Sequence, residues 1–209
     1  MLMLLFTAFI IMTAYYRGEI KTARQQTAQL VADASQRHGT EIQPWDLSSQ
    51  RKSMILAIED PSFMSHQGVD FETPGAGVTT ISQGLVKLLY FPDGFKPGIA
   101  KMRQTLIARY AFDPMVSKDE QLQLFLNMSY LGHVEGKAVH GFANAAEVYF
   151  DKPYAELMDE EFMSLVVMLI GPNGLKPGTG AHQERMARVE AYLVPDREVS
   201  IGRYFLKKR

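Results

Sequence analysis

The sequence contains no cysteine, and this absence removes several kinds of chemistry. None of its 209 residues can supply a thiolate nucleophile, a disulfide or a cysteine ligand for zinc. The absence is compatible with an oxidising compartment but does not identify one.

Neither positive nor negative charge is in large excess. The formal net charge is -1 and the isoelectric point is about 6.5. Basic residues are scattered except at the extreme C-terminus. No global field would gather nucleic acid, so we expect no nucleic-acid partner. The length and the 46% hydrophobic content suit one domain plus an anchor rather than two full domains.

Long apolar runs are missing except at the start of the chain. Residues 1–16 carry no charge, and Tyr15, Tyr16 and Arg17 form an aromatic and basic group that suits a membrane interface. We predict a membrane anchor, although a spanning helix needs about 20 apolar residues. A signal peptide is disfavoured because the leading region has no positive charge and the stretch before Arg17 offers no clear cleavage site. A buried helix of a soluble protein is disfavoured because no face of the segment is polar.

Helical periodicity dominates the rest of the chain, so the predicted fold class is mainly α. Residues 61–78 are rich in Pro and Gly and predict a loop, and we find no strong strand alternation. Ser117 and Glu120 make a capping-box signature, and Asp159 is predicted to cap a further helix. Helices are expected over residues 20–37, 48–59, 79–90, 99–110, 185–193 and 197–209, and from residues 117 and 159 onward.

The densest polar cluster runs from Glu59 to Asp70. Two adjacent carboxylates, Glu59 and Asp60, stand at a predicted helix end, and His66 comes next in the Gly- and Pro-rich loop. Such a group suits general acid or base catalysis, because an apolar environment can raise a carboxyl pKa toward neutrality. The alternative is an ordinary surface helix terminus, and composition alone favours that alternative.

A second polar cluster opens the helix predicted over residues 79–90. Thr79, Thr80, Ser82 and Gln83 lie at its start, and Lys87 comes four residues after Gln83 on the same face. Backbone N–H groups and the helix dipole favour phosphate at such a place. The alternative is an N-cap with a solvated lysine, and spacing alone favours this alternative too.

Taken in order, these and later segments closely resemble glycosyltransferase family 51. This family comprises the peptidoglycan glycosyltransferase domains of bifunctional penicillin-binding proteins and the monofunctional biosynthetic transglycosylases. The resemblance covers roughly residues 46–193, and its first motif is specific. The matching residues are Glu-Asp-x-x-Phe-x-x-His-x-Gly at 59–68, Gly-x-Thr-Thr-Ile-Ser-Gln at 77–83 with Lys87, Ser-Lys-Asp-x-x-Leu-x-Leu-x-Leu-Asn at 117–127, Tyr-Leu-Gly at 130–132 and Tyr-Phe-x-Lys at 149–152.

The resemblance implies a lysozyme-like helical lobe, a smaller membrane-proximal lobe and a cleft for two lipid-linked disaccharide-peptides. In the family, the first-motif glutamate is the general base on the acceptor 4-hydroxyl, which displaces undecaprenyl pyrophosphate with inversion. Glu59 matches that residue, and Asp60 and His66 become orienting or loop-holding residues. The implied domains are an anchor at 1–17, a linker helix at 18–45, the glycosyltransferase domain at 46–195 and a basic C-terminal helix or tail at 196–209.

The residues that depart from the family pattern are those expected to bind the donor, the substrate that loses its pyrophosphate. Gly84 stands after Gln83 where the family has a second glutamine. The family's Arg-Lys-x-x-Glu motif aligns with residues 101–105, so its acidic position is Thr105 and one lysine position is Met102. Losing stabilisation of a leaving group can cost factors of roughly a hundred to a thousand in rate.

Other cations can partly replace the lost charges. Arg103 offers a cation from a different helix face, and Lys96 can stand in for the upstream arginine. The segment between Asp70 and Gly77 is much shorter than in the family and removes most of the mobile helix over the donor site. The candidate substrate-binding residues are Asp60, His66, Thr80, Gln83, Lys87, Lys96, Lys101 and Arg103. If the side chains of the cations and of Gln83 meet at one phosphate-sized site opposite Glu59, a working donor site is favoured. If they point to different places, the donor site is expected to be defunct.

Three functions remain open from the sequence. The first is a lipid II-polymerising glycosyltransferase in the bacterial inner membrane, single-pass, with its domain on the periplasmic or outer face. The second is a weak or inactive relative that binds lipid-linked precursor or a cell-wall synthesis partner, favoured by Thr105. The third, ranked last, is a lysozyme-like hydrolase that uses Glu59. The expected partners are lipid II, the growing glycan strand and the membrane. No cofactor is expected to be required, and the candidate ion at the donor pyrophosphate is Mg²⁺ or Mn²⁺.

Overall fold

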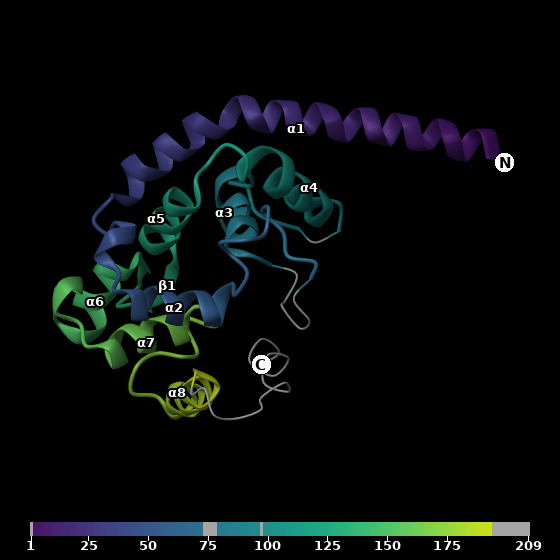
Figure 1. Cartoon of the computed structure of the whole chain (residues 1–209). Helices are drawn as coiled ribbons and strands as arrows, with labels where there is room; N and C mark the ends of the chain where they lie inside the picture. The colour runs from purple at the N-terminus through teal and green to yellow at the C-terminus, as the bar shows by residue number, and fades with distance from the viewer. Residues whose placement is uncertain (1, 73–78, 97, 194–209) are drawn as a thin grey trace.

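The computed structural model describes residues 2–72, 79–96 and 98–193, and this part of the chain is mainly helical, as predicted (Figure 1). The helix predicted over 197–209 and the basic segment 196–209 lie outside the described residues. The elements are α1 Leu2–His38, η1 Pro44–Asp46, α2 Ser49–Glu59, α3 Ile81–Tyr90, α4 Ile99–Ile107, η2 Ala108–Phe112, α5 Lys118–Met128, β1 Tyr130–Val134, β2 Lys137–His140, α6 Phe142–Phe150, η3 Tyr154–Glu156, α7 Asp159–Met168 and α8 Gly180–Leu193.

Helix α1 joins the predicted anchor and the predicted linker into one continuous helix. Its N-terminal half projects away from the other elements (Figure 1), and its apolar side chains there are exposed. Within residues 3–38 the helix is long and apolar enough to cross a membrane. Its second half buries a stripe at helical spacing made of Ala23, Thr27, Val31 and Ala34. The change from an all-apolar sequence to a single apolar stripe therefore marks where the helix begins to pack on the domain.

Polar contacts fix α1 to the domain. Glu19 forms an ion pair with Arg103 of α4. Arg24 Nε donates to the carbonyl of Tyr110 in the π-helix η2 at 2.9 Å. Farther along, the hydroxyls of Thr27 and Tyr90 lie 2.7 Å apart. The orientation of α1 is thus set by α3, α4 and η2 together.

The remaining helices form two packed groups that α5 connects (Figure 1). Helices α3 and α4 with η2 pack on α1, whereas α2, α6, α7 and α8 pack on one another, and α5 contacts both α3 and α6. Fully buried phenylalanines fill the centres of these groups, where each removes a large apolar surface from water. They are Phe63, Phe112, Phe142 and Phe162.

A two-stranded antiparallel hairpin, β1 and β2, was not predicted. Its turn consists of Glu135 and Gly136, both at positive φ (51° and 78°), as a two-residue hairpin turn requires. Glu-Gly is not one of the residue pairs that usually announce such a turn. A register irregularity between Tyr130 and His133 also breaks the alternation of buried and exposed residues. These two features explain why the sequence pattern did not indicate strands.

Some of the predicted helix ends are found in the structure and others are not. Ser117 caps α5, since its hydroxyl accepts from the N–H of Glu120 at 3.2 Å. The predicted cap at Asp159 is wrong, because this residue is the first of α7 and pairs with Arg51 at 2.7 Å. The carboxylate of Glu161 accepts from the N–H of Met158 instead, at 2.8 Å. Helix α8 begins at Gly180, five residues before the predicted start at 185.

Replacing Asn127 by Ala should lower the free energy of unfolding by about 2–4 kcal/mol. The buried Asn127 amide donates to the carbonyl of Ile42 at 2.8 Å and accepts from its N–H at 3.2 Å. Alanine would leave both backbone groups buried without a partner. Denaturant titration of the detergent-solubilised protein, monitored by far-UV circular dichroism, measures the loss. The matched control is Asn144→Ala, which removes one long bond of 3.4 Å at an exposed site. Equal stability of the two variants would contradict the prediction.

Candidate functional site

Glu59 is the last residue of α2 and is half-buried. Helix α2 begins after Ser48, whose hydroxyl accepts from the N–H of Arg51 at 3.1 Å. Ile55 and Ile58 turn into the core, and Glu59 comes next at the helix end. Glu59 is therefore not among the fully buried residues of the core, and its role as general base remains a prediction.

The neighbouring Asp60 is buried, with 3% of its surface exposed to solvent, and its carboxylate contacts two other segments. Its Oδ2 accepts from the N–H of Ile81 at 2.9 Å and lies 2.9 Å from His66 Nε2. One carboxylate thus joins the end of α2, the loop after it and the start of α3. Asp60 and His66 hold the loop in this arrangement, and any direct contact of theirs with substrate remains a prediction.

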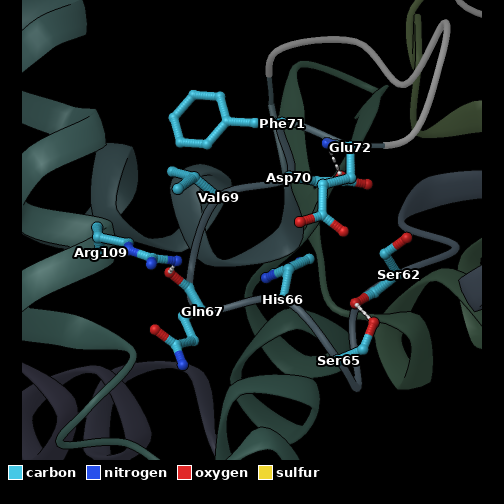
Figure 2. Close-up of a pocket in the computed structure, with 9 residues that line it drawn as sticks. All are labelled: Ser62, Ser65, His66, Gln67, Val69, Asp70, Phe71, Glu72 and Arg109. Atoms are coloured by element: carbon cyan, nitrogen blue, oxygen red, sulfur yellow. Dashed lines mark hydrogen bonds between the residues drawn. The ribbon is translucent and has the colours of Figure 1, made fainter.

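The loop after Asp60 and Arg109 of η2 line a polar, partly open pocket of about 320 Å³ (Figure 2). In Figure 2 the guanidinium of Arg109 points toward the carbonyl of Gln67, 3.4 Å away. Gly68 has φ +78°, and a Cβ there would meet the Ala108 carbonyl oxygen at 2.4 Å, so only glycine fits. The lining residues are Ser62, Ser65, His66, Gln67, Val69, Asp70, Phe71, Glu72 and Arg109.

At the start of α3, Thr80 and Gln83 are buried and engage each other in a capping box. The Thr80 hydroxyl accepts from the N–H of Gln83 at 3.1 Å and donates to the carbonyl of Gly68 at 2.8 Å. The Gln83 side-chain oxygen accepts from the N–H of Thr80 at 3.1 Å. Both side chains therefore form hydrogen bonds within the protein. Their proposed place beside a pyrophosphate remains a prediction.

Thr105 is the residue predicted to stand at the family's second acidic position, and this correspondence remains a prediction. Its hydroxyl accepts from Gln83 Nε2 at 3.0 Å and donates to the carbonyl of Lys101 at 2.9 Å. Gln104 donates to the Gln83 carbonyl at 2.6 Å beside it. Thr105, Gln83 and Gln104 thus form a neutral hydrogen-bonded group.

Of the predicted cations, Lys87 and Lys101 lie near each other. Burial lowers the pKa of Lys101, and the positive charge of Lys87 lowers it further. Lys101 Nζ lies 3.4 Å from the Thr79 hydroxyl, and Lys87 Nζ lies 5.5 Å from the centre of the Phe95 ring. Two ammonium groups beside a threonine hydroxyl make a place where an anion would relieve repulsion.

The other two predicted cations do not join this pair. Arg103 forms its ion pair with Glu19 of α1, and its guanidinium lies over the Phe91 ring at 5.4 Å. Lys96 is exposed in the α3–α4 connection. The predicted convergence on one phosphate-sized site is therefore partial.

Arg185 is a candidate that sequence reasoning missed. It is 3% exposed and lines, with Arg188 of the same helix, a second cavity of about 550 Å³ under the turn at 170–175. Burial and the charge of Arg188 lower the pKa of Arg185, and the nearby carboxylate of Glu59 counteracts them. No local signal marks this residue, because an arginine on an amphipathic helix is usually solvated.

The described residues do not offer a protein-built divalent cation site. They contain no group of three His, Asp or Glu side chains placed to hold a metal ion. Around Thr105 the available groups are hydroxyls, amides and ammonium groups, whereas Mg²⁺ and Mn²⁺ prefer carboxylate oxygens. An ion at the donor pyrophosphate would therefore have to take its oxygen ligands mainly from the substrate, and it remains a prediction.

The matching family model and the similar proteins are transglycosylases or penicillin-binding proteins. A family model described as Transglycosylase matches residues 24–195. The chain is 31% identical over 147 residues to a penicillin-binding protein 1B from Vibrio cholerae, covering 64% of this chain and 19% of the relative. It is 28% identical over 220 residues to a biosynthetic peptidoglycan transglycosylase from Alcanivorax borkumensis, covering 93% and 87%. It is 26% identical over 197 residues to a putative transglycosylase from Cupriavidus necator, covering 88% and 81%.

Replacing Lys87 by Met should raise the pKa of Lys101. The substitution removes the neighbouring positive charge and leaves burial in place, so the pKa moves toward its ordinary value without reaching it. Reductive methylation with ¹³C and an NMR titration of the lysine signals measures the change. Lys137→Met, at an exposed position of β2, is the control and should leave Lys101 unaltered. The same pKa in both variants would show that the two lysines do not interact.

Proposed function

Because the chain belongs to the transglycosylase family, whose model matches residues 24–195, we propose that it is a peptidoglycan glycosyltransferase that polymerises lipid II. The observation that carries the proposal is the half-buried carboxylate of Glu59, held beside the buried Asp60 and outside the core. The printed name of the Alcanivorax relative, which covers 93% of this chain, supports the same reaction class.

In the proposed reaction Glu59 removes the proton from the acceptor sugar's 4-hydroxyl. The oxygen then attacks the anomeric carbon of the donor, and the bond from that carbon to the pyrophosphate oxygen breaks. The electron pair leaves with undecaprenyl pyrophosphate, and the anomeric configuration inverts. A carboxylate is needed because a sugar hydroxyl is a weak acid and a poor nucleophile until its proton is taken up.

The departing pyrophosphate requires positive charge, and Lys101 and Lys87 are its proposed binding groups. Both are close enough to interact, and Lys101 also reaches Thr79. Since the pKa of Lys101 lies below that of a free lysine, its positive charge is lost at a lower pH than usual as the pH rises. A bound pyrophosphate would reverse this shift by adding negative charge next to the ammonium group.

The substrate is itself a lipid, which agrees with an enzyme anchored by α1. We propose a single-pass protein of the bacterial inner membrane with the helical domain on the outer face. The long exposed apolar half of α1 supports this placement. The growing glycan strand is then its product and partner, and other cell-wall synthesis proteins are further proposed partners.

Thr105 supports a second candidate function, a weak or inactive relative that binds precursor without efficient turnover. The hydroxyl of Thr105 binds Gln83 and Lys101 instead of supplying a carboxylate. Arg103, the other cation of this helix, faces α1. These features reduce the number of charged groups available to the donor.

Glu59→Gln should reduce polymerisation of lipid II by at least about a hundredfold, because a catalytic base contributes roughly that much or more. The variant keeps the size of the side chain and should still bind lipid II. Glu147→Gln, at an exposed position of α6, is the matched control and should polymerise like the wild type. Turnover is measured by gel analysis of the glycan from labelled lipid II in detergent micelles.

The outcomes separate the candidates. Polymer from the wild type and from Glu147→Gln, with none from Glu59→Gln, supports the glycosyltransferase. Binding of lipid II without turnover by any form supports the inactive relative. Cleavage of preformed glycan strands that depends on Glu59 supports a hydrolase and contradicts the proposal.

A further inference from the structure

We propose that an open pocket between α7 and α8 binds the basic segment 203–209 of this same chain, which lies outside the described residues. The pocket has a volume of about 430 Å³ and shares no residue with the two described above. We call it the α7–α8 pocket. The lining residues that matter here are Phe150, Met158, Glu160, Glu161, Met186 and Glu190.

The wall of the α7–α8 pocket is mainly apolar. Phe150 and Met186 belong to α6 and α8, and Met158, just before α7, is 58% exposed. Methionine side chains adapt to the shape of an apolar partner. An exposed apolar pocket with polar residues around it is typical of an interaction site. The pocket therefore favours a ligand with large apolar side chains.

Three glutamates line the same pocket. Glu161 pairs with Lys152 at 2.6 Å and accepts from the N–H of Met158. Glu160 and Glu190 are exposed, and within the described part of the chain their carboxylates form neither an ion pair nor a side-chain hydrogen bond. Two negative charges at the pocket are thus without a counter-charge there. A ligand that is basic as well as apolar complements them.

The two helices that form the pocket are held together by a buried pair that also lines it. His182 of α8 and Ser164 of α7 are each 5% exposed, and His182 Nε2 lies 2.8 Å from Ser164 Oγ. The hydroxyl of Thr179 accepts from the N–H of His182 at 3.3 Å, which fixes the start of α8 as well. The pocket is therefore preformed, and binding to it requires little rearrangement of the domain.

The segment 203–209 has a matching composition. Its sequence is Arg-Tyr-Phe-Leu-Lys-Lys-Arg, which contains no acidic residue and places three aromatic or apolar residues between basic ones. Basic residues elsewhere in the chain are scattered. The apolar residues of the segment suit the wall of the pocket, and the flanking cations suit the two exposed glutamates.

The chain is long enough for this contact to form within one molecule. Helix α8 ends at Leu193, and Gln183 of the pocket lies about 15 Å back along the helix. The connecting residues 194–202 can span up to about 30 Å when extended. A group joined by so short a connection has an effective concentration of about 1 mM or more. A separate protein with the same composition would have to exceed that concentration, so the chain's own segment is the favoured occupant.

A bilayer is a poorer occupant of the pocket. The apolar N-terminal half of α1 projects away from α7 and α8, so the membrane proposed to hold that half does not cover the pocket (Figure 1). Basic and aromatic segments can also bind anionic headgroups. The bilayer is therefore the competitor for the segment, and the test includes it.

The proposed contact acts on the helix that carries Arg185. Met186 of the α7–α8 pocket directly follows Arg185, which lines the second cavity on a different side of α8. A segment bound in the α7–α8 pocket would hold α8 against α7 without entering the second cavity.

Disulfide trapping in the full chain tests the contact, because the protein has no cysteine of its own. Gln183→Cys with Gly202→Cys, the pocket pair, places one thiol in the pocket and the other next to the segment. Ala181→Cys with Gly202→Cys is the control pair. Gln183 and Ala181 are both exposed and only two positions apart, but Ala181 lines the second cavity instead. Oxidation of the detergent-solubilised protein is followed by mass spectrometry of the linked peptides.

We expect the pocket pair to form its disulfide at least about tenfold faster than the control pair, because docking raises the local concentration of one thiol at the other. Equal rates would overturn the proposal. Links between two molecules instead of within one would identify a contact between copies and would also overturn it. Loss of the pocket link in vesicles that contain anionic lipid would assign the segment to the bilayer, with the same consequence.

Charge reversal separates docking from mere proximity. Glu160→Lys with Glu190→Lys should slow the pocket pair to the rate of the control pair, because the basic segment then meets positive charges. Adding Lys207→Glu and Lys208→Glu should restore most of the rate. Far-UV circular dichroism checks that each variant is folded. A rate that does not respond to either change would contradict the proposal. These measurements do not involve lipid II, so failure of the proposed function is detected separately.

Discussion

The buried carboxylate of Asp60 is the interaction on which the arrangement of the site depends. It accepts from the first backbone N–H of α3 and lies within hydrogen-bonding distance of the His66 ring. Hydrogen bonds to a buried charged group are stronger than neutral ones, and losing one partner leaves a costly uncompensated group. Glu59 directly precedes this carboxylate and therefore has its position set by it. The start of α3, which leads to Lys87, is set by the same atom.

The charged residues of the candidate site do not all stand alone: Glu59 interacts with Arg185, and Lys87 interacts with Lys101. Glu59 stands at the end of α2. Burial of Lys101 lowers its pKa, and repulsion by the positive charge of Lys87, in the last turn of α3, lowers it further. Thr105 is predicted to stand at the family's second acidic position, where its side chain carries no charge. A pyrophosphate would supply the missing negative charge. The same substitution is therefore consistent with a weakened enzyme and with a donor site that relies on its substrate for neutralisation.

Local features of the fold could be predicted from the sequence, because they depend on residues close together in the chain. Ser117 was predicted as a helix cap and is one, and Glu59 was predicted at a helix end and is the last residue of α2. The family membership was predicted from motif order and was confirmed by the match over residues 24–195.

Contacts between distant segments could not be predicted from local patterns. The pairing of Arg103 with Glu19 joins residues 84 positions apart, and the burial of Arg185 depends on how α8 packs beside α2 and α7. The hairpin was missed because its turn lacks the usual residues and its register is irregular. Asp159 was predicted as a cap because the neighbouring sequence does not reveal its partner Arg51, which lies 108 positions away in the chain.

The most direct test of Glu59 as the general base is a structure of the Glu59→Gln protein with lipid II bound both as donor and as acceptor. We expect the acceptor's 4-hydroxyl oxygen to lie within about 2.6–3.2 Å of the residue 59 side chain, the reach that proton transfer requires. We also expect the donor pyrophosphate to contact Lys101. An acceptor hydroxyl that points away from residue 59, or a pyrophosphate bound elsewhere, would contradict the proposed mechanism.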